Sequence, residues 1–331
     1  MADALTSLGN GRDMDLFWTA PFMAYSTAAV GAGLLEFGHQ KGSVVGTWCQ
    51  SSIELLMTVL GAAQVGAVVA ALPTTASVQQ VQEVLASEQV RTLLFDERVG
   101  QTSQLDALVG LLPELTEPSS LNWLNLKRFR ALRQVVNVTS DEVHHGLLSF
   151  RSVPVYDPMP HPVPLIQRHL HADDAVLRPF AQAADGKLAR QDDLSWTAIH
   201  ETATALAKEV DLGEHDRILI TAPVTSRAGI AAVAAGIHTG AKLVFAGRGF
   251  KADTVGAIAG KQRPTVIVAD GAHAEAAGSA VSAADGGVAA LRAVVVAASG
   301  SAAPAGTWGK VKPVVVNSDA MASADKAWVK A

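Results

Sequence analysis

Residues 42–73 read GSVVGTWCQSSIELLMTVLGAAQVGAVVAALP, and this stretch decides the fold. An apolar run at 44–49 is followed by a helical stretch that Ser51 or Ser52 can cap. A glycine-containing turn then leads to a second apolar run at 67–72. Because buried parallel strands are continuous apolar runs, the stretch predicts a strand, a helix and a second, parallel strand.

The segment 55–72 is also nearly long enough and apolar enough to cross a bilayer. Gly61, Gln64 and Gly66 interrupt it, however, and these residues are typical of a helix end and a turn. We therefore expect a buried helix, a turn and a buried strand, and a chain that does not itself span a membrane.

The same alternation continues along the chain. Further strands are expected at 92–95, 134–138, 217–221, 241–246, 265–269, 291–297 and 314–316, and further helices after Ser77 and at 105–112, 194–210, 225–239 and 254–261. A proline-rich connector at 152–171 separates two α/β halves. We expect subdomains 1–172 and 173–331, with two helix-flanked, mostly parallel sheets packed on each other.

Composition excludes several classes of protein. The 331 residues are 49% hydrophobic and only 17% charged, so a large core can form. The net charge is −5 and no long basic run occurs, so no nucleic-acid contact is expected. Cys49 is the only cysteine, so no internal disulfide can form. Residues 1–18 lack the features of a signal or transit peptide.

Several short segments, taken in order, resemble the adenylate-forming ligases, the family of the acyl-CoA synthetases. The clearest piece is LGAAQVGAVV at 60–69, which is similar to the family's lGalkaGAvvv. The other segments are 42–46, 50–54, 81–95, 211–221, 223–229, 240–244, 264–268 and 291–296. Their collinear order carries the resemblance, which covers most of the chain. It implies the fold of the N-terminal domain of these ligases.

The resemblance also implies an ATP site with a phosphate loop rich in Gly, Ser and Thr and containing a Lys. The matching segment 181–190 reads AQAADGKLAR, in which only Gly186 agrees cleanly. The Lys position falls on Ala189, and Asp185 would repel a triphosphate. The family's adenine-stacking Tyr and magnesium-binding Glu have no counterpart in the matching segment 319–323. The family's C-terminal lid, with its catalytic Lys, also has no counterpart among the segments that carry the resemblance.

A further departure lies at Thr225 and Ser226, where the family has an aromatic residue and a His. We therefore expect a chain that is not an enzyme, with no catalytic, cofactor-binding or metal-binding residue and no cofactor. The expected role is that of a structural or accessory subunit whose partners are other protein subunits of a hetero-oligomeric assembly. A mitochondrial complex is the expected setting, and the cytoplasm is the alternative. The alternative functions are an acyl-CoA or adenine-nucleotide binding module and a residual adenylate-forming ligase.

A third alternative is an NAD(P)-binding oxidoreductase. The sequence GRGFKA at Gly247–Ala252 fits G-x-G-x-x-A, follows an expected strand and precedes an expected helix. Asp270 ends the next strand at a suitable distance for a ribose hydroxyl. A glycine-containing βα turn explains the same residues, and we favour that interpretation.

Three other features have simpler interpretations than a functional site. His169 and His171, with Asp173 and Asp174 beside them, could begin a zinc site, but His161 is the only nearby third imidazole. A solvated linker explains this pattern better. The segment 299–301 lacks the spacing of a nucleophile elbow, and Cys49 is expected to be a small core residue.

Overall fold

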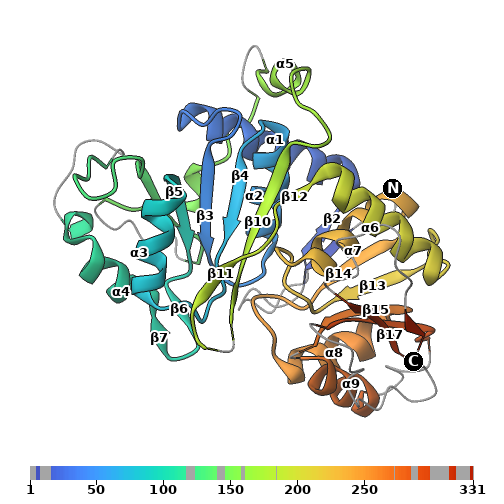
Figure 1. Cartoon of the computed structure of the whole chain (residues 1–331). Helices are drawn as coiled ribbons and strands as arrows, with labels where there is room; N and C mark the ends of the chain where they lie inside the picture. The colour runs from blue at the N-terminus through green and yellow to red at the C-terminus, as the bar shows by residue number, and fades with distance from the viewer. Residues whose placement is uncertain are drawn as a thin grey trace. The chain divides into compact units, whose positions relative to one another are not determined.

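The described part of the chain contains two large sheets, each accompanied by helices, and one short two-stranded hairpin (Figure 1). The computed structural model describes residues 5–7, 16–116, 124–139, 146–157, 161–183, 185–271, 273–284, 290–298, 313–317 and 329–330. Internal contacts divide the chain into two units. The N-terminal unit is Met23–Trp196, and the C-terminal unit is Thr197–Ala331 together with Met1–Phe22. The predicted α/β class with mostly parallel sheets is confirmed.

The sheet of the N-terminal unit has the strand order β11-β10-β4-β3-β5-β8-β9, with β12 paired to β10. Neighbours from β10 to β9 are parallel, whereas β11 and β12 are antiparallel to β10. The strands are β3 Val44–Trp48, β4 Val68–Ala71, β5 Val90–Phe95, β8 Gln134–Asn137, β9 Leu148–Ser149, β10 Ala175–Gln182, β11 Leu188–Arg190 and β12 Leu194–Ser195.

The helices and small elements of this unit connect these strands. They are α1 Ala20–Glu36, which begins before the unit boundary, α2 Ile53–Gln64, α3 Val78–Ser87, α4 Gln104–Leu111, α5 Val163–Gln167, the 3-10 turns η1 Pro113–Thr116 and η2 Phe150–Ser152, and the hairpin β6 Arg98–Val99 and β7 Thr102–Ser103. The proline-rich connector thus contains the short helix α5, whose Pro162 and Pro164 lie at its start, where proline is tolerated.

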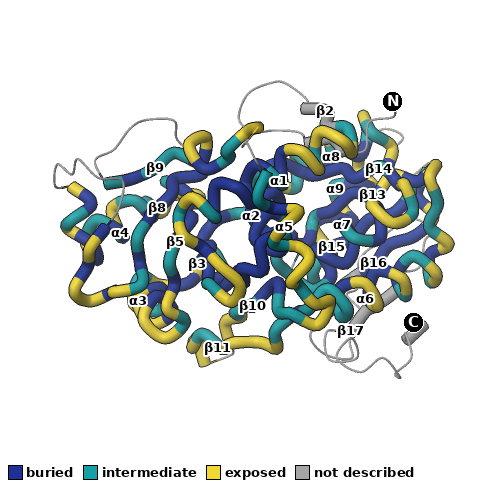
Figure 2. Tube along the Cα trace, turned by 90° about the horizontal axis from the view of Figure 1, so that it is seen from above, coloured by how far each residue is buried: buried dark blue, intermediate teal, exposed yellow. Residues whose placement is uncertain are grey.

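The opening sequence stretch folds as its pattern predicts. Ser52 caps α2 by accepting the backbone N–H of Leu55, and Ser77 forms a capping box with Gln80 at the start of α3. Every residue of β3 and β4 is buried, and Figure 2 shows buried residues at the centre of this unit. The expected buried helix, turn and buried strand are therefore present in the segment 55–72. No helix in the described residues is long and apolar enough to cross a membrane.

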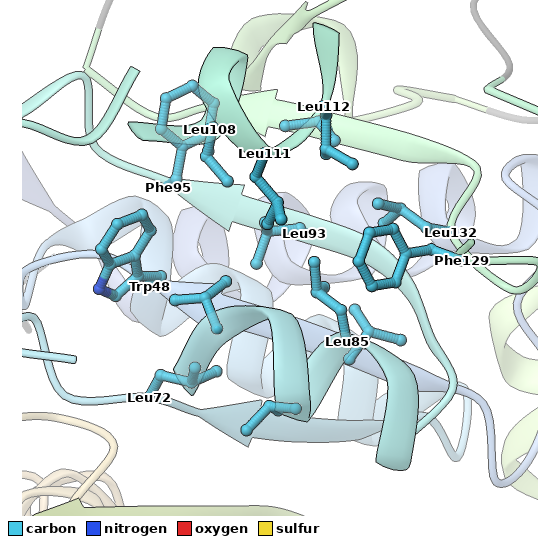
Figure 3. Packing of buried hydrophobic residues seen from close by; sticks show 14 of the residues in the cluster. Trp48, Leu72, Leu85, Leu93, Phe95, Leu108, Leu111, Leu112, Phe129 and Leu132 are labelled. Atoms are coloured by element: carbon cyan, nitrogen blue, oxygen red, sulfur yellow. The ribbon is translucent and has the colours of Figure 1, made fainter. Parts of the chain in front are cut away.

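An apolar cluster fills the space between this sheet and helices α3 and α4 (Figure 3). Phe95 of β5 is fully buried, and Trp48 at the end of β3 is 3% exposed. Leu108 of α4 and Leu85 of α3 close the cluster from the helical side. Because such interiors are close-packed, the cluster holds the carboxyl ends of β3 and β5 in a defined register.

The boundary between the units differs from the one expected at residues 172 and 173. It lies between Trp196 and Thr197, because β10 pairs in parallel with β4 and so belongs to the first sheet. The sequence predicted that a second α/β subdomain begins at residue 173. Strand β10 instead returns to the sheet that was already built.

The sheet of the C-terminal unit has the order β18-β17-β16-β15-β13-β14-β1-β2. Only the edge strands β18 and β2 are antiparallel to their neighbours. The strands are β1 Leu5–Ser7, β2 Leu16–Trp18, β13 Arg217–Ile220, β14 Lys242–Phe245, β15 Val266–Asp270, β16 Ala293–Ala298, β17 Pro313–Asn317 and β18 Val329–Lys330, and the helices are α6 Trp196–Glu209, α7 Arg227–Thr239, α8 Ala252–Gln262 and α9 Ala274–Ala283.

Candidate functional site

The segment that resembles a phosphate loop forms the tight turn between β10 and β11. The two strands pair in antiparallel fashion, with Gln182 opposite Leu188. Gly186 closes the turn with a φ of +78°, a conformation that favours glycine. Its N–H donates to the carbonyl of Ala183 over 2.9 Å, and the Ala183 N–H donates to the carbonyl of Lys187 over 2.8 Å. These backbone donors are therefore used within the hairpin.

The charged groups of this turn are a carboxylate and an ammonium on the surface. Asp185 Oδ1 accepts the backbone N–H of Lys187 over 3.0 Å, and Asp185 Oδ2 lies 3.6 Å from Lys187 Nζ. The two side chains are 57% and 85% exposed. Water screens such a pair, so an anionic ligand would lose little by taking the ammonium from the carboxylate. Lys187 is therefore the cation that this turn can offer to a phosphate.

The turn is fastened to the start of α3. Gln80 Nε2 donates to the carbonyl of Gly186 over 2.8 Å, while Gln80 Oε1 accepts the backbone N–H of Ser77. The hydroxyl of Thr75 donates to Gln182 Oε1 over 3.0 Å. One glutamine thus caps a helix and holds the turn, so the position of the turn depends on α3.

An ion network stabilises the base of the same hairpin. Arg178 of β10 forms two hydrogen bonds with Asp193, of 2.9 and 2.7 Å, and a third with Glu88, of 2.5 Å. Arg190 of β11 lies 3.2 Å from Asp193 and 3.7 Å from Glu88. The hydrogen bond from Arg178 lowers the pKa of Asp193, although burial opposes this effect. The two cations and two anions neutralise each other, so the network stabilises the hairpin and has no net charge to attract a ligand.

In the C-terminal unit, the carboxyl ends of the parallel strands are the general place for a ligand. Ser226, the counterpart of the family's His, lies in the loop after β13. Its hydroxyl accepts the N–H of Gly229 over 3.1 Å and donates to the carbonyl of Pro223 over 2.7 Å. This hydroxyl therefore caps α7. A Cβ on Gly229 would lie 2.0 Å from the Pro223 carbonyl oxygen, so the turn requires glycine there.

The Gly247–Ala252 segment is a βα turn from β14 to α8, with positive φ angles at Gly247 and Gly249. The local part of the dinucleotide motif is thus present. However, β13 lies between β14 and β15, so Asp270 does not end the strand next to the glycine turn. In a dinucleotide-binding fold those two strands are neighbours. The strand order therefore departs from that fold.

Asp270 instead forms a cluster with His273 and Phe250, which sequence reasoning did not find. Asp270 Oδ1 accepts the backbone N–H of His273 over 2.9 Å and lies 2.8 Å from His273 Nδ1. An ionised carboxylate can only accept, so Nδ1 donates the proton of this hydrogen bond. The Phe250 ring stacks on the imidazole at a centroid distance of 4.5 Å. The Asp-x-x-His spacing after a strand is the signal that could have predicted this pair.

The histidines of the connector lie beside a salt bridge. Asp174 Oδ2 accepts the backbone N–H of His171 over 2.7 Å and lies 2.6 Å from Lys41 Nζ. The hydrogen bond from His171, followed by that from Lys41, lowers the pKa of Asp174. No group of three or more His, Cys, Asp or Glu side chains among the described residues could hold a metal. Cys49 is buried, as expected of a core residue.

Two segments singled out from the sequence lie outside the described residues. They are 319–323, which the resemblance places at the adenine and magnesium site, and 299–301, the rejected nucleophile elbow.

The fold is that of the N-terminal domain of the adenylate-forming ligases. Residues 24–166 match the model of a family described as "AMP-binding enzyme". No curated protein matches the chain. The predicted resemblance to the adenylate-forming ligases is thereby confirmed, and the solved structures below show the same fold.

Three solved ligases illustrate this similarity. The anthranilate CoA ligase AuaEII in complex with anthranoyl-AMP is 17% identical, with a TM-score of 0.67 over 89% of this chain and 52% of that one. A long-chain-fatty-acid-CoA ligase from Archaeoglobus fulgidus is 16% identical, with a TM-score of 0.69 over 97% of this chain and 61% of that one. Acetoacetyl-CoA synthetase from Streptomyces lividans is 18% identical, with a TM-score of 0.68 over 96% of this chain and 50% of that one. The chain thus spans between half and two thirds of the length of these ligases.

These findings overturn the expectation that the chain is not an enzyme. The matching family model is that of an enzyme, and the similar structures are ligases. The expectation rested on lost motif residues at 181–190 and 319–323 and on the missing lid. One of those segments retains its hairpin with Lys187 on the surface, and the other lies outside the described residues. Ligase activity is therefore a function to be tested.

Proposed function

We propose that this chain binds an adenine nucleotide or an acyl adenylate, as a module of the adenylate-forming ligase type. The observation that supports this most directly is the similarity, over 89% of the chain, to a ligase that holds anthranoyl-AMP. The β10–β11 hairpin adds a local reason, because the segment aligned with the phosphate loop keeps a glycine turn and an exposed ammonium.

The phosphate contact is assigned to Lys187. Its ammonium is bound only to an exposed carboxylate, so a triphosphate can compete for it. Asp185 opposes the same ligand by charge, and its replacement by a hydroxyl residue would supply a donor where the aligned loop of the ligases has one. The two neighbouring residues should therefore act in opposite directions on nucleotide affinity.

Calorimetric titration with ATP, AMP and an acyl-sulfamoyl adenosine, with magnesium present, tests the proposal. Lys187→Ala should weaken ATP binding about fivefold, which corresponds to roughly 1 kcal/mol for one exposed charge contact. Asp185→Ser should strengthen it. The matched control is Lys127→Ala, an exposed lysine elsewhere in the N-terminal unit. If none of the three nucleotides binds the unaltered chain, the proposal is wrong.

A pyrophosphate-exchange assay on the same samples separates binding from chemistry. Exchange that depends on an added carboxylic acid would show that the chain performs adenylation. Nucleotide binding without exchange would support a binding module. Either result leaves the binding proposal in place and decides how far the resemblance extends to activity.

We also propose that other protein subunits join this chain in a hetero-oligomer, with a mitochondrial complex as the setting. The supporting observation is an exposed aromatic pair in the N-terminal unit: Tyr25 and Tyr156 are 39% and 52% exposed, with ring centroids 5.4 Å apart. Exposed aromatic residues are enriched at protein interfaces. Mass measurement of the native particle should give a mass above that of the chain. The double variant Tyr25→Ser/Tyr156→Ser should release the partners, and an unaltered native mass in that variant would contradict this assignment.

A further inference from the structure

Two histidines on neighbouring helices of the C-terminal unit face each other across the surface. His200 of α6 and His238 of α7 have ring centroids 5.7 Å apart and ring planes inclined at 84°. Both residues are exposed, and they are 38 positions apart in the sequence. Only the tertiary structure brings the two imidazoles together.

Their surroundings do not explain the pairing as an ordinary ion pair. Within the described part of the chain, each ring has the other as its neighbour and has neither a hydrogen bond nor an ion pair to an acidic side chain. By contrast, His273 is held by Asp270, and His215 lies 3.7 Å from Glu214. The nitrogen lone pairs of His200 and His238 are therefore available to an external partner.

The separation fits chelation of one metal ion. A zinc–nitrogen bond is about 2.0–2.1 Å long, which places the metal roughly 3.2 Å from the centroid of each imidazole. For nitrogen–metal–nitrogen angles of roughly 110–130°, two such centroids lie about 5–6 Å apart. The observed 5.7 Å falls in this range. Steeply inclined rings are compatible with ligands that approach a tetrahedral ion from different directions.

We propose that His200 and His238 form a two-histidine site for a borderline divalent cation such as Zn²⁺, with water completing the coordination. Imidazole suits Zn²⁺, Ni²⁺ and Cu²⁺ and does not suit Mg²⁺. His238 lies in the last turn of α7, where the partial negative charge of a helix end favours a cation. The ion would bridge α6 and α7, so its binding would stabilise the contact between two helices. The site is separate from the β10–β11 hairpin and does not depend on the proposed nucleotide binding.

Titration of the full chain with Zn²⁺ at pH 7.5, followed by calorimetry, tests this site. His200→Ala and His238→Ala should each weaken binding about tenfold or more, since loss of even an outer-shell partner of a metal ligand costs 10- to 100-fold. His215→Ala and His273→Ala are the matched controls and should bind Zn²⁺ as the unaltered chain does. Mg²⁺ should not bind.

A second pair of measurements distinguishes ligation from ring packing. His238→Phe keeps an aromatic ring at the contact but has no nitrogen, so it should lose Zn²⁺ binding and keep the fold. Zn²⁺ should slow amide hydrogen exchange in Trp196–Glu209 and Arg227–Thr239 of the unaltered chain and not of His238→Phe. Unchanged Zn²⁺ affinity in both His200→Ala and His238→Ala, or loss of binding in His273→Ala instead, would overturn the proposal.

Discussion

His39 makes the stability of the N-terminal unit depend on pH. It is 3% exposed, and its Nε2 lies 2.8 Å from the hydroxyl of Thr92, which donates to Gln134 Oε1 over 3.0 Å. Because that hydroxyl already donates its proton to Gln134, it can only accept from His39. The Nε2 atom of His39 therefore carries a proton. Burial, with a smaller contribution from the Arg91 guanidinium, lowers the pKa of His39 to about 3.

The sign of the effect follows from this lowered pKa. An unfolded chain takes up a proton at His39 below a pKa of about 6.5, whereas the folded chain does not do so until about pH 3. Stability is therefore unaffected by His39 above about pH 7 and falls as the pH decreases from 6.5 towards 3. At pH 5 the difference of about 1.5 pH units corresponds to a loss of roughly 2 kcal/mol.

The measurement compares the unaltered chain with His39→Gln, whose amide can donate to the Thr92 hydroxyl but does not titrate. Hydrogen exchange of the amides in Val90–Phe95, at the centre of the sheet, reports the opening free energy of this unit at pH 7.5 and pH 5. Groups other than His39 contribute equally to both proteins. The unaltered chain should lose about 2 kcal/mol more between the two pH values. An equal loss in both proteins would refute the reasoning.

Three further predictions concern stability. Burial alone would raise the pKa of Asp216, but hydrogen bonds from Arg292 and from other donors lower it to about 2. This carboxylate therefore contributes roughly 2–3 kcal/mol to stability above about pH 4, and the contribution is lost as the pH falls through 2. Chemical denaturation of Asp216→Asn should show a loss of that size at pH 7 and none at pH 2. Arg178→Ala should cost roughly 2–3 kcal/mol of stability because it leaves two partly buried carboxylates without their main partner. Arg178→Lys should recover only part of this loss, since lysine cannot form the paired hydrogen bonds. Equal melting temperatures for the two variants would contradict this role of the paired hydrogen bonds. Gly229→Ala should cost about 1–3 kcal/mol because its Cβ would meet the Pro223 carbonyl at 2.0 Å; a melting temperature equal to that of the unaltered chain would show that the loop can move aside.

Much of the secondary structure could be predicted because the signals are local. The apolar runs that become β3, β4, β5 and β8 each fill a strand that is buried along its whole length or nearly so. Ser52 and Ser77 cap helices through hydrogen bonds to residues three positions ahead, a spacing visible in the sequence. The resemblance to the ligases rests on the same collinear segments, and it predicted the fold.

The candidate site was only partly predictable. The resemblance implied a loop at 181–190, and the structure has the turn between β10 and β11 there, with Gly186 at a positive φ. The expectation of lost activity was drawn from missing motif side chains and a missing lid, and the match to an enzyme family and the similarity to solved ligases overturn it. The way Gln80 holds the turn from another helix could not be predicted, since it depends on a contact across 106 residues.

By itself, the sequence determined the alternation of strands and helices, the caps and the class of fold, because hydrophobic periodicity and capping act between residues a few positions apart. Only the tertiary structure decided the order of the strands. It placed β13 between β14 and β15, returned β10 to the first sheet, and brought His200 to His238. Strand order and cross-helix contacts depend on packing between segments distant in sequence, and the same local pattern is compatible with several such arrangements.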